Sequence, residues 1–180
     1  MLRYAQGEAA AFDLLYGRHR SPVFRYVLRQ LSGNRAHAEE LFQDIWVNVV
    51  GARGGYKVEA RFTTWLYTIA HNRVVDHYRR HRPIEVVQAD PDDDDDPVAE
   101  APAPDTAQPE RIAQARQQAR LLLALVEALP VAQREAFLLH EEAGLSVDEI
   151  ASVTGTDREA IKSRLRYALA KLRQGMGDLL

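Results

Sequence analysis

Residues 145–173 read LSVDEIASVTGTDREAIKSRLRYALAKLR, and this stretch decides the fold of the 180-residue chain. Two segments in it, which begin at Ser146 and Thr156, have the capping-box pattern of a hydroxyl followed three residues later by glutamate. In a capping box the hydroxyl accepts from the third amide of the helix, and the glutamate reaches back to the amide of the capping residue. Gly155 separates the two predicted helix starts. A short helix, a turn with glycine and a longer helix form a helix-turn-helix.

The two predicted helices differ in charge. We expect the first to stop near Gly155 and to bury Val147, Ile150 and Ala151. The second has five apolar residues at helical spacing, all expected to be buried: Ile161, Leu165, Ala168, Leu169 and Leu172. It also has six cationic residues against Glu159, for a net charge of +5: Arg158, Lys162, Arg164, Arg166, Lys171 and Arg173. The longer helix is therefore basic on the side away from its core.

One face of the longer helix has the residue types that read DNA. Spacings of three, four and seven residues place four side chains on this face: Glu159, Lys162, Ser163 and Arg166. In a major groove, arginine and lysine pair with guanine edges and a serine hydroxyl pairs with a base or a phosphate. The N-terminus of the helix binds a backbone phosphate. We therefore predict DNA recognition by this helix; the alternative is a solvated basic face on a helical bundle.

Charge divides the chain into three parts. Between Pro83 and Glu110 there are ten acidic residues and no Lys or Arg, which leaves the remainder at +7 because the whole chain carries −3. Prolines and the run Asp92–Asp96 prevent a helix there and leave little to bury. We therefore predict an all-α fold in which an acidic linker, residues 83–109, loosely tethers two small helical domains, 1–82 and 110–180. A basic remainder beside an acidic segment is typical of nucleic-acid-binding proteins.

The N-terminal part contains two further predicted helices. Apolar residues recur at helical spacing between Ala38 and Val49, next to an acidic face with Glu40, Gln43 and Asp44. Glycines follow this helix, so we expect residues 51–61 to form an exposed loop. Another helix begins near residue 61 and carries five Arg against one Asp up to residue 82, a net charge of +4.

The start of this basic helix brings aromatic rings close to cations, since FTTWLY from Phe62 runs into NRVVDHYRRHR. Proteins hold opened single strands in this way, because bases stack on aromatic rings while arginines attract phosphates. Trp65 is a candidate for stacking, although core packing with Ile69 is the favoured role for it. The arginines near Arg79 are expected to face DNA rather than solvent alone.

Composition and motifs exclude several classes of protein. Without cysteine the chain has no disulfide, no thiolate metal site and no cysteine nucleophile, and it suits a reducing cytoplasm. No apolar run has the length of a membrane span, and no export signal is recognisable. His77 with His81, and the run Asp92–Asp96, lack the companion ligands of a metal site. We expect no catalytic residue, no metal and no cofactor, and clustered carboxylates for a metal-dependent nuclease are missing.

Four ordered blocks of this sequence resemble one known family. They read AEELFQDIWVNV from Ala38, RFTTWLYTIAHNRVVDHYRRHR from Arg61, LPVAQREAFLLHEEAGLSVDEIA from Leu129 and AIKSRLRYALAKLR from Ala160. Together they resemble an extracytoplasmic-function (ECF) sigma factor over nearly the whole chain outside the linker. The resemblance implies that the chain binds core RNA polymerase and promoter DNA and directs promoter recognition, DNA melting and transcription initiation.

The resemblance also implies roles for individual residues. Glu40, Gln43 and Asp44 match the segment that grips the clamp helices of the polymerase. The reader of the promoter minus-ten element is expected to include Tyr56, Lys57, Arg61, Phe62, Thr63, Trp65, Asn72, Arg73, Asp76, His77, Tyr78, Arg79 and Arg80. The reader of the minus-thirty-five element is expected to include Arg158, Glu159, Ala160, Lys162, Ser163, Arg164, Arg166 and Tyr167.

Partners follow from the same resemblance. It implies an inhibitory anti-sigma factor, often membrane-bound, that covers the polymerase-binding surface, while the chain itself does not insert into a membrane. The linker resembles the segment that passes through the nucleic-acid channels of the polymerase. A stand-alone helix-turn-helix transcription regulator is the alternative function, and it leaves the aromatic-basic helix and the acidic face near Glu40 without a role.

Overall fold

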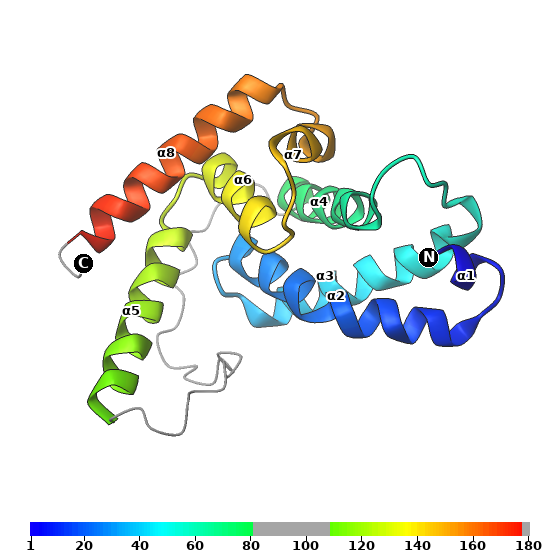
Figure 1. Cartoon of the computed structure of the whole chain (residues 1–180), viewed down its shortest axis with the longest axis horizontal. Coiled ribbons are helices and arrows are strands. Elements are labelled where there is room, and N and C mark those ends of the chain that lie inside the picture. The colour runs from blue at the N-terminus through cyan, green and yellow to red at the C-terminus, as the bar shows by residue number, and fades with distance from the viewer. Residues whose placement is uncertain (81–108, 178–180) are drawn as a thin grey trace.

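The chain folds into helices that form two packed groups. The computed structural model describes residues 1–80 and 109–177, and every regular element in those ranges is helical (Figure 1). The N-terminal domain contains α1 (Leu2–Ala5), α2 (Ala9–Gln30), α3 (Arg35–Gly51), the 3₁₀ turn η1 (Ala52–Gly55) and α4 (Phe62–Arg80). The C-terminal domain contains α5 (Pro109–Glu127), α6 (Val131–Glu141), α7 (Val147–Thr154) and α8 (Arg158–Met176). The predicted all-α fold is confirmed; the predicted linker, including Asp92–Asp96, lies outside the described residues apart from Pro109.

Local signals define the helix-turn-helix of α7 and α8. Ser146 caps α7 through a complete capping box, because its Oγ accepts from the amide of Glu149 at 3.3 Å and Glu149 Oε2 accepts from the amide of Ser146 at 2.9 Å. Gly155 ends α7 with φ of +62°, a left-handed conformation that glycine adopts without strain. The predicted start and end of α7 are confirmed.

Two details of α8 differ from the sequence prediction. Its cap is Asp157, whose Oδ1 accepts from the amide of Ala160 at 2.9 Å, and not Thr156 in a second capping box. Asp157 lies one residue closer to the helix, and Glu159 pairs instead with Lys162 at 2.7 Å. Leu169 was expected in the core but is 37% exposed, whereas the other four apolar positions of the stripe are buried. One residue of the apolar stripe of α8 therefore lies outside the surface that packs on the core.

Helix α2 is a long helix that the sequence pattern does not predict. It contains Gly17 and, within the helix, Pro22, both of which lower helical preference. Packing against α3 and α4 compensates, since Val23, Tyr26 and Val27 are fully buried in the core that these helices share. Helix α3 covers its predicted range and α4 covers its predicted range as far as Arg80, while residues 81–82 lie outside the described residues. The segment between the two helices is exposed apart from a half-buried Tyr56.

The two domains pack directly on each other rather than lying on a loose tether. Helix α7 contacts α4, and α6 contacts α2, so that one continuous apolar core runs through both domains (Figure 1). Charged side chains surround this core. On the C-terminal domain they include Glu135, Glu142 and Glu149, each of which contacts a side chain of the N-terminal domain, and Arg134, which donates to the hydroxyl of Ser32 at 3.1 Å. We call this surface the domain junction.

The cap of α7 gives a first testable prediction. Substitution of an N-cap serine by alanine removes a hydrogen bond to an otherwise unpaired amide and costs about 1 kcal/mol. We expect Ser146→Ala to lower the free energy of unfolding, measured by urea denaturation, by this amount. Ser152→Ala is the control, since Ser152 is exposed within the same helix and should change stability little. Equal effects of the two substitutions would contradict the role of the cap.

Candidate nucleic-acid interface

Helix α8 presents a basic face to solvent. Its four fully packed apolar residues point into the core, while Lys162, Arg166 and Tyr167 are exposed on other sides of the helix. The guanidinium of Arg166 lies 5.1 Å from the centre of the Tyr167 ring, and the ammonium of Lys162 lies 2.7 Å from Glu159. The two cations are therefore held at the surface in defined positions, as major-groove recognition requires.

Two other cations of the predicted minus-thirty-five reader contact side chains of α7 or of the turn before α8. Arg158 is paired with Asp148 of α7 at 3.2 Å, and Arg164 donates to the Thr156 hydroxyl at 3.3 Å. Ala160 and Ser163 are half-buried. Lys162 and Arg166 are thus the cations of this set that extend from the middle of the exposed face.

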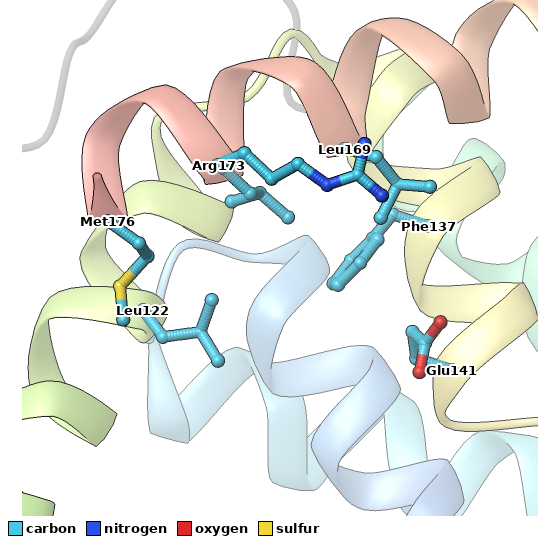
Figure 2. Close-up of a pocket in the computed structure, with 7 residues that line it drawn as sticks. Leu122, Phe137, Glu141, Leu169, Arg173 and Met176 are labelled. Atoms are coloured by element: carbon cyan, nitrogen blue, oxygen red, sulfur yellow. The ribbon is translucent and has the colours of Figure 1, made fainter. Parts of the chain in front are cut away.

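An open apolar groove lies along α8 on another side (Figure 2). Its volume is about 320 Å³, and α5, α6 and α8 contribute to its lining: Leu122, Phe137, Glu141, Leu169, Leu172, Arg173 and Met176. Leu169 points into this groove beside Phe137, which explains why it remains exposed despite its place in the apolar stripe.

An aromatic cluster forms where the exposed loop meets α4. The Trp65 ring lies 5.1 Å from that of Tyr56 and 5.8 Å from that of Phe62, and His19 of α2 lies 5.2 Å from Phe62. All four side chains are half-buried, so their ring edges and faces remain accessible. This placement of Trp65 is compatible with both roles considered for it, packing within the domain and stacking on a DNA base. Lys57 is exposed beside the cluster.

Two residues at the start of α4 have features that the sequence does not reveal. The hydroxyl of Thr63 is buried without a hydrogen-bond partner in the protein. Arg61 is largely exposed, yet its guanidinium lies 3.5 Å from Glu149 of α7. Arg61 of the predicted minus-ten reader therefore lies at the domain junction.

The remainder of α4 divides into exposed and inward-facing residues. Asn72, Arg79 and Arg80 are exposed, and Asp76 and His77 are half-buried. Arg73 donates to Asn48 of α3 at 3.0 Å, and the Tyr78 hydroxyl donates to the carbonyl of Gln30. Burial raises the pKa of Tyr78 above its usual value. Arg73 and Tyr78 thus brace α4 against α3 and α2, while the last turn of α4 faces solvent.

The acidic face of α3 is exposed to solvent in the described structure. Glu40, Gln43 and Asp44 are all exposed and lie within five residues, so they share one side of the helix. Val47 follows on the same side and is 69% exposed. This side of α3 thus presents two carboxylates, one amide and one apolar side chain to solvent.

The carboxylate of Glu149 occupies the centre of the domain junction. Its Oε1 accepts from the hydroxyl of Thr64 at 2.9 Å, while its Oε2 completes the capping box with Ser146. The hydrogen bond from the Ser146 amide is the main cause that lowers the pKa of Glu149; Thr64 and Arg61 lower it further and burial opposes them. The capping-box pattern predicts the local bond, but no sequence signal predicts the contact with Thr64.

Two further observations concern membrane-spanning helices and metal sites. In the ranges 1–80 and 109–177 no helix is long and apolar enough to cross a membrane. The same ranges contain no group of three or more histidine or acidic side chains arranged to hold a metal ion.

Comparisons with known proteins agree with this arrangement. The family described as Sigma-70 region 2 matches residues 15–84, and Sigma-70 region 4 matches residues 119–172. The chain is 32% identical to the RNA polymerase sigma factor CarQ of Myxococcus xanthus, over 99% of this chain and 97% of CarQ. It is also 32% identical to the ECF RNA polymerase sigma factor SigL of Mycobacterium tuberculosis, over 97% of this chain and 94% of SigL.

A solved structure has the same fold. The sigma factor RpoE of Bartonella quintana, in its complex with the anti-sigma factor NepR, superposes with a TM-score of 0.69 at 20% identity. The superposition covers 93% of this chain and 97% of RpoE.

The order of the two regions defines the class of protein: a transcription initiation factor with sigma-70 region 2 in its N-terminal domain and region 4 in its C-terminal domain. The chain belongs to the extracytoplasmic-function family of RNA polymerase sigma factors. It binds core RNA polymerase and promoter DNA and directs promoter recognition. A stand-alone helix-turn-helix regulator is less well supported, because the sigma-70 family matches extend over both the N-terminal and the C-terminal domain.

The lowered pKa of Glu149 predicts a pH-dependent stability. A carboxyl group whose pKa is lower in the folded than in the unfolded chain stabilises the fold above its unfolded pKa, and this contribution is lost as the pH falls through its folded pKa. Glu149→Gln, which keeps a capping-box side chain, should therefore be less stable than wild type at pH 7. The difference should shrink below about pH 4.5, the usual value for glutamate. Urea denaturation at pH 7 and pH 3 measures it, and a gap of constant size would contradict the prediction.

Proposed function

We propose that this sigma factor acts through three separate surfaces: one on α3, one on α4 with the loop before it, and one on α8. The exposed face of α3 with Glu40, Gln43 and Asp44 binds the clamp helices of core RNA polymerase. The loop 51–61 and α4 read the minus-ten element, and α8 reads the minus-thirty-five element. The observation that carries this proposal is the presence of an accessible aromatic-basic helix on one domain and an accessible basic recognition helix on the other.

The minus-ten reader combines rings and cations. A base that leaves the stack can lie against Tyr56, Phe62 or Trp65, whose rings form one cluster. Exposed Lys57, together with Arg79 and Arg80 at the far end of α4, attracts the backbone phosphates on either side. Stacking tolerates every base, so this surface suits the opening of DNA as well as its recognition.

The minus-thirty-five reader is a helix in a major groove. Lys162 and Arg166 extend from the exposed middle of α8, where they can donate to the O6 and N7 atoms of guanine. The N-terminus of α8, capped by Asp157, lies at the level of a backbone phosphate in this docking geometry. The C-terminal domain thus positions the protein on duplex DNA.

We also propose boundaries for the two domains, a role for the linker, a cellular location and an inhibitor. We assign residues 1–82 and 110–180 to the two DNA-binding domains and 83–109 to an acidic linker. With nine acidic residues between 83 and 109, the linker competes with DNA for basic surfaces and suits a path through the nucleic-acid channels of the polymerase. The protein works in the cytoplasm by binding rather than catalysis. An anti-sigma factor is its proposed inhibitor, because a sigma factor of the same fold is known in complex with one.

The polymerase-binding face is tested by a double substitution. Gln43→Ala with Asp44→Ala removes two polar groups from the exposed side of α3 without touching the core. We expect the variant to lose binding to core RNA polymerase in a pull-down and to lose promoter opening in the same samples.

Glu39→Ala is the matched control, since Glu39 is exposed on the same helix and contacts only Arg35 in the described structure. It should bind and open promoters like wild type. A wild-type protein that ignores polymerase yet binds duplex DNA on its own would overturn the proposed function.

The recognition helix gives a second test in the presence of polymerase. Lys162→Ala and Arg166→Ala should each weaken binding to a minus-thirty-five duplex by about 1 to 3 kcal/mol and relax its sequence preference. Lys171→Ala, which removes an exposed charge near the end of α8, should keep the sequence preference. Arg79→Ala on α4 should instead reduce the salt dependence of binding: the slope of log K against log salt concentration should be smaller by about 1. Unchanged preference in both reading-face variants would contradict the assignment of α8.

A further inference from the structure

A histidine on α2 adds a fourth ring to the aromatic cluster of the minus-ten reader. We call Tyr56, Phe62 and Trp65 the ring cluster, since the ring of Phe62 lies 6.3 Å from that of Tyr56 and 5.8 Å from that of Trp65. The imidazole of His19 lies 5.2 Å from the ring of Phe62, and α2 packs against α4. A base that stacks on Phe62 is therefore a neighbour of His19 as well.

The ring nitrogens of His19 have no partner in the protein. Within the described residues neither nitrogen makes a hydrogen bond, and both reach solvent although the side chain is half-buried. Partial burial of a polar ring without a hydrogen bond costs free energy that an apolar ring in the same place would not. Packing against Phe62 explains a ring at this position, but it does not explain the two nitrogens.

The imidazole of His19 is neutral at pH 7. Burial is the main cause that lowers its pKa below the usual value for histidine, and the charge of Arg18 lowers it further. A neutral imidazole has one N–H donor and one acceptor nitrogen. Because bases differ in the pattern of donors and acceptors on their edges, such a pair of nitrogens can favour one base over another.

Arg18 offers a phosphate contact beside this imidazole. Its side chain is exposed and pairs with no acidic side chain among the described residues. An unpaired guanidinium attracts the DNA backbone whatever the sequence, because phosphate contacts position a protein while base contacts specify. Adjacent residues of α2 thus combine a group suited to a base with a group suited to a phosphate.

We propose that His19 is a base-reading residue of the minus-ten reader: its imidazole hydrogen-bonds to a base that stacks on the ring cluster, while Arg18 binds a phosphate of the same strand. The inference rests on the proposed assignment of the loop 51–61 and α4 to the minus-ten element. It extends that reader to a third element, α2. The ring cluster binds any base by stacking, and His19 adds a preference among bases.

The hydrogen-bonding role is tested with His19→Phe, which keeps a ring against Phe62 and removes both nitrogens. Holoenzyme is assembled from core RNA polymerase and either wild type or the variant. Each holoenzyme then selects from promoter DNA whose minus-ten bases are randomised, within a promoter first selected with wild type. Sequencing of the bound DNA measures the base preference at every position. Circular dichroism and a pull-down of core polymerase establish that the variant folds and docks.

We expect His19→Phe to reduce the preference for the favoured base at one minus-ten position by about 3- to 10-fold, the value of a single hydrogen bond, and to leave the other positions unchanged. Arg18→Ala should weaken binding to every sequence alike, and the slope of log K against log salt concentration should be smaller by about 1. Arg20→Ala is the matched control and should change neither quantity. Arg20 is also exposed on α2 but lies about 200° around the helix from Arg18.

Photo-crosslinking gives a measurement that does not depend on packing. A photoreactive phenylalanine derivative at position 19 should crosslink to a minus-ten strand in the open promoter complex, and the same group at position 20 should not. An unchanged base preference with His19→Phe, an equal loss at every position, or no crosslink from position 19 would each overturn the role of His19. If wild-type holoenzyme showed no minus-ten preference, or if Tyr56→Ala with Trp65→Ala left it unchanged, the proposed minus-ten reader would be wrong and the inference would fail with it.

Discussion

The carboxylate of Glu149 connects the local structure of α7 with the contact between the two domains. One of its oxygens accepts from the Ser146 amide and starts the helix; the other accepts from Thr64 on α4. A carboxylate oxygen has two lone pairs and the group has two oxygens, so both tasks are compatible. The orientation of α7, and with it that of the recognition helix α8, therefore depends on the same side chain that joins the domains.

The reading surfaces are built on helices whose opposite faces are tightly packed. Ile161, Leu165, Ala168 and Leu172 anchor α8 in the core, and Arg73 and Tyr78 brace α4 against its neighbours. Rigid supports of this kind keep Lys162 and Arg166 on one side and the ring cluster near Trp65 on the other in defined positions. A sigma factor needs such rigidity within each domain, because sequence preference depends on the geometry of a few contacts.

Between the domains, flexibility rather than rigidity is required, because the two readers must reach promoter elements that lie far apart on the DNA. The charged contacts of the junction differ in exposure: Arg25 lies 2.8 Å from Glu142, with 37% of the arginine side chain but only 15% of the glutamate side chain exposed. Partly exposed ion pairs contribute little each and exchange readily with solvent or with a partner. The domains thus share an apolar core with polar contacts around it, while each keeps a reading surface of its own.

The sequence by itself determined the parts of this protein that rest on neighbouring residues. The capping box at Ser146, the left-handed Gly155 and the basic face of α8 are local, so their periodicity and spacing predicted the helix-turn-helix, and four sequence blocks predicted the family. Other features were not predictable. Helix α2 forms despite Gly17 and Pro22 because α3 and α4 bury its apolar side, and Leu169 faces a groove that three helices create. Only the tertiary structure decided that the domains close, because the contact of Glu149 with Thr64 joins residues 85 positions apart, which no local pattern encodes.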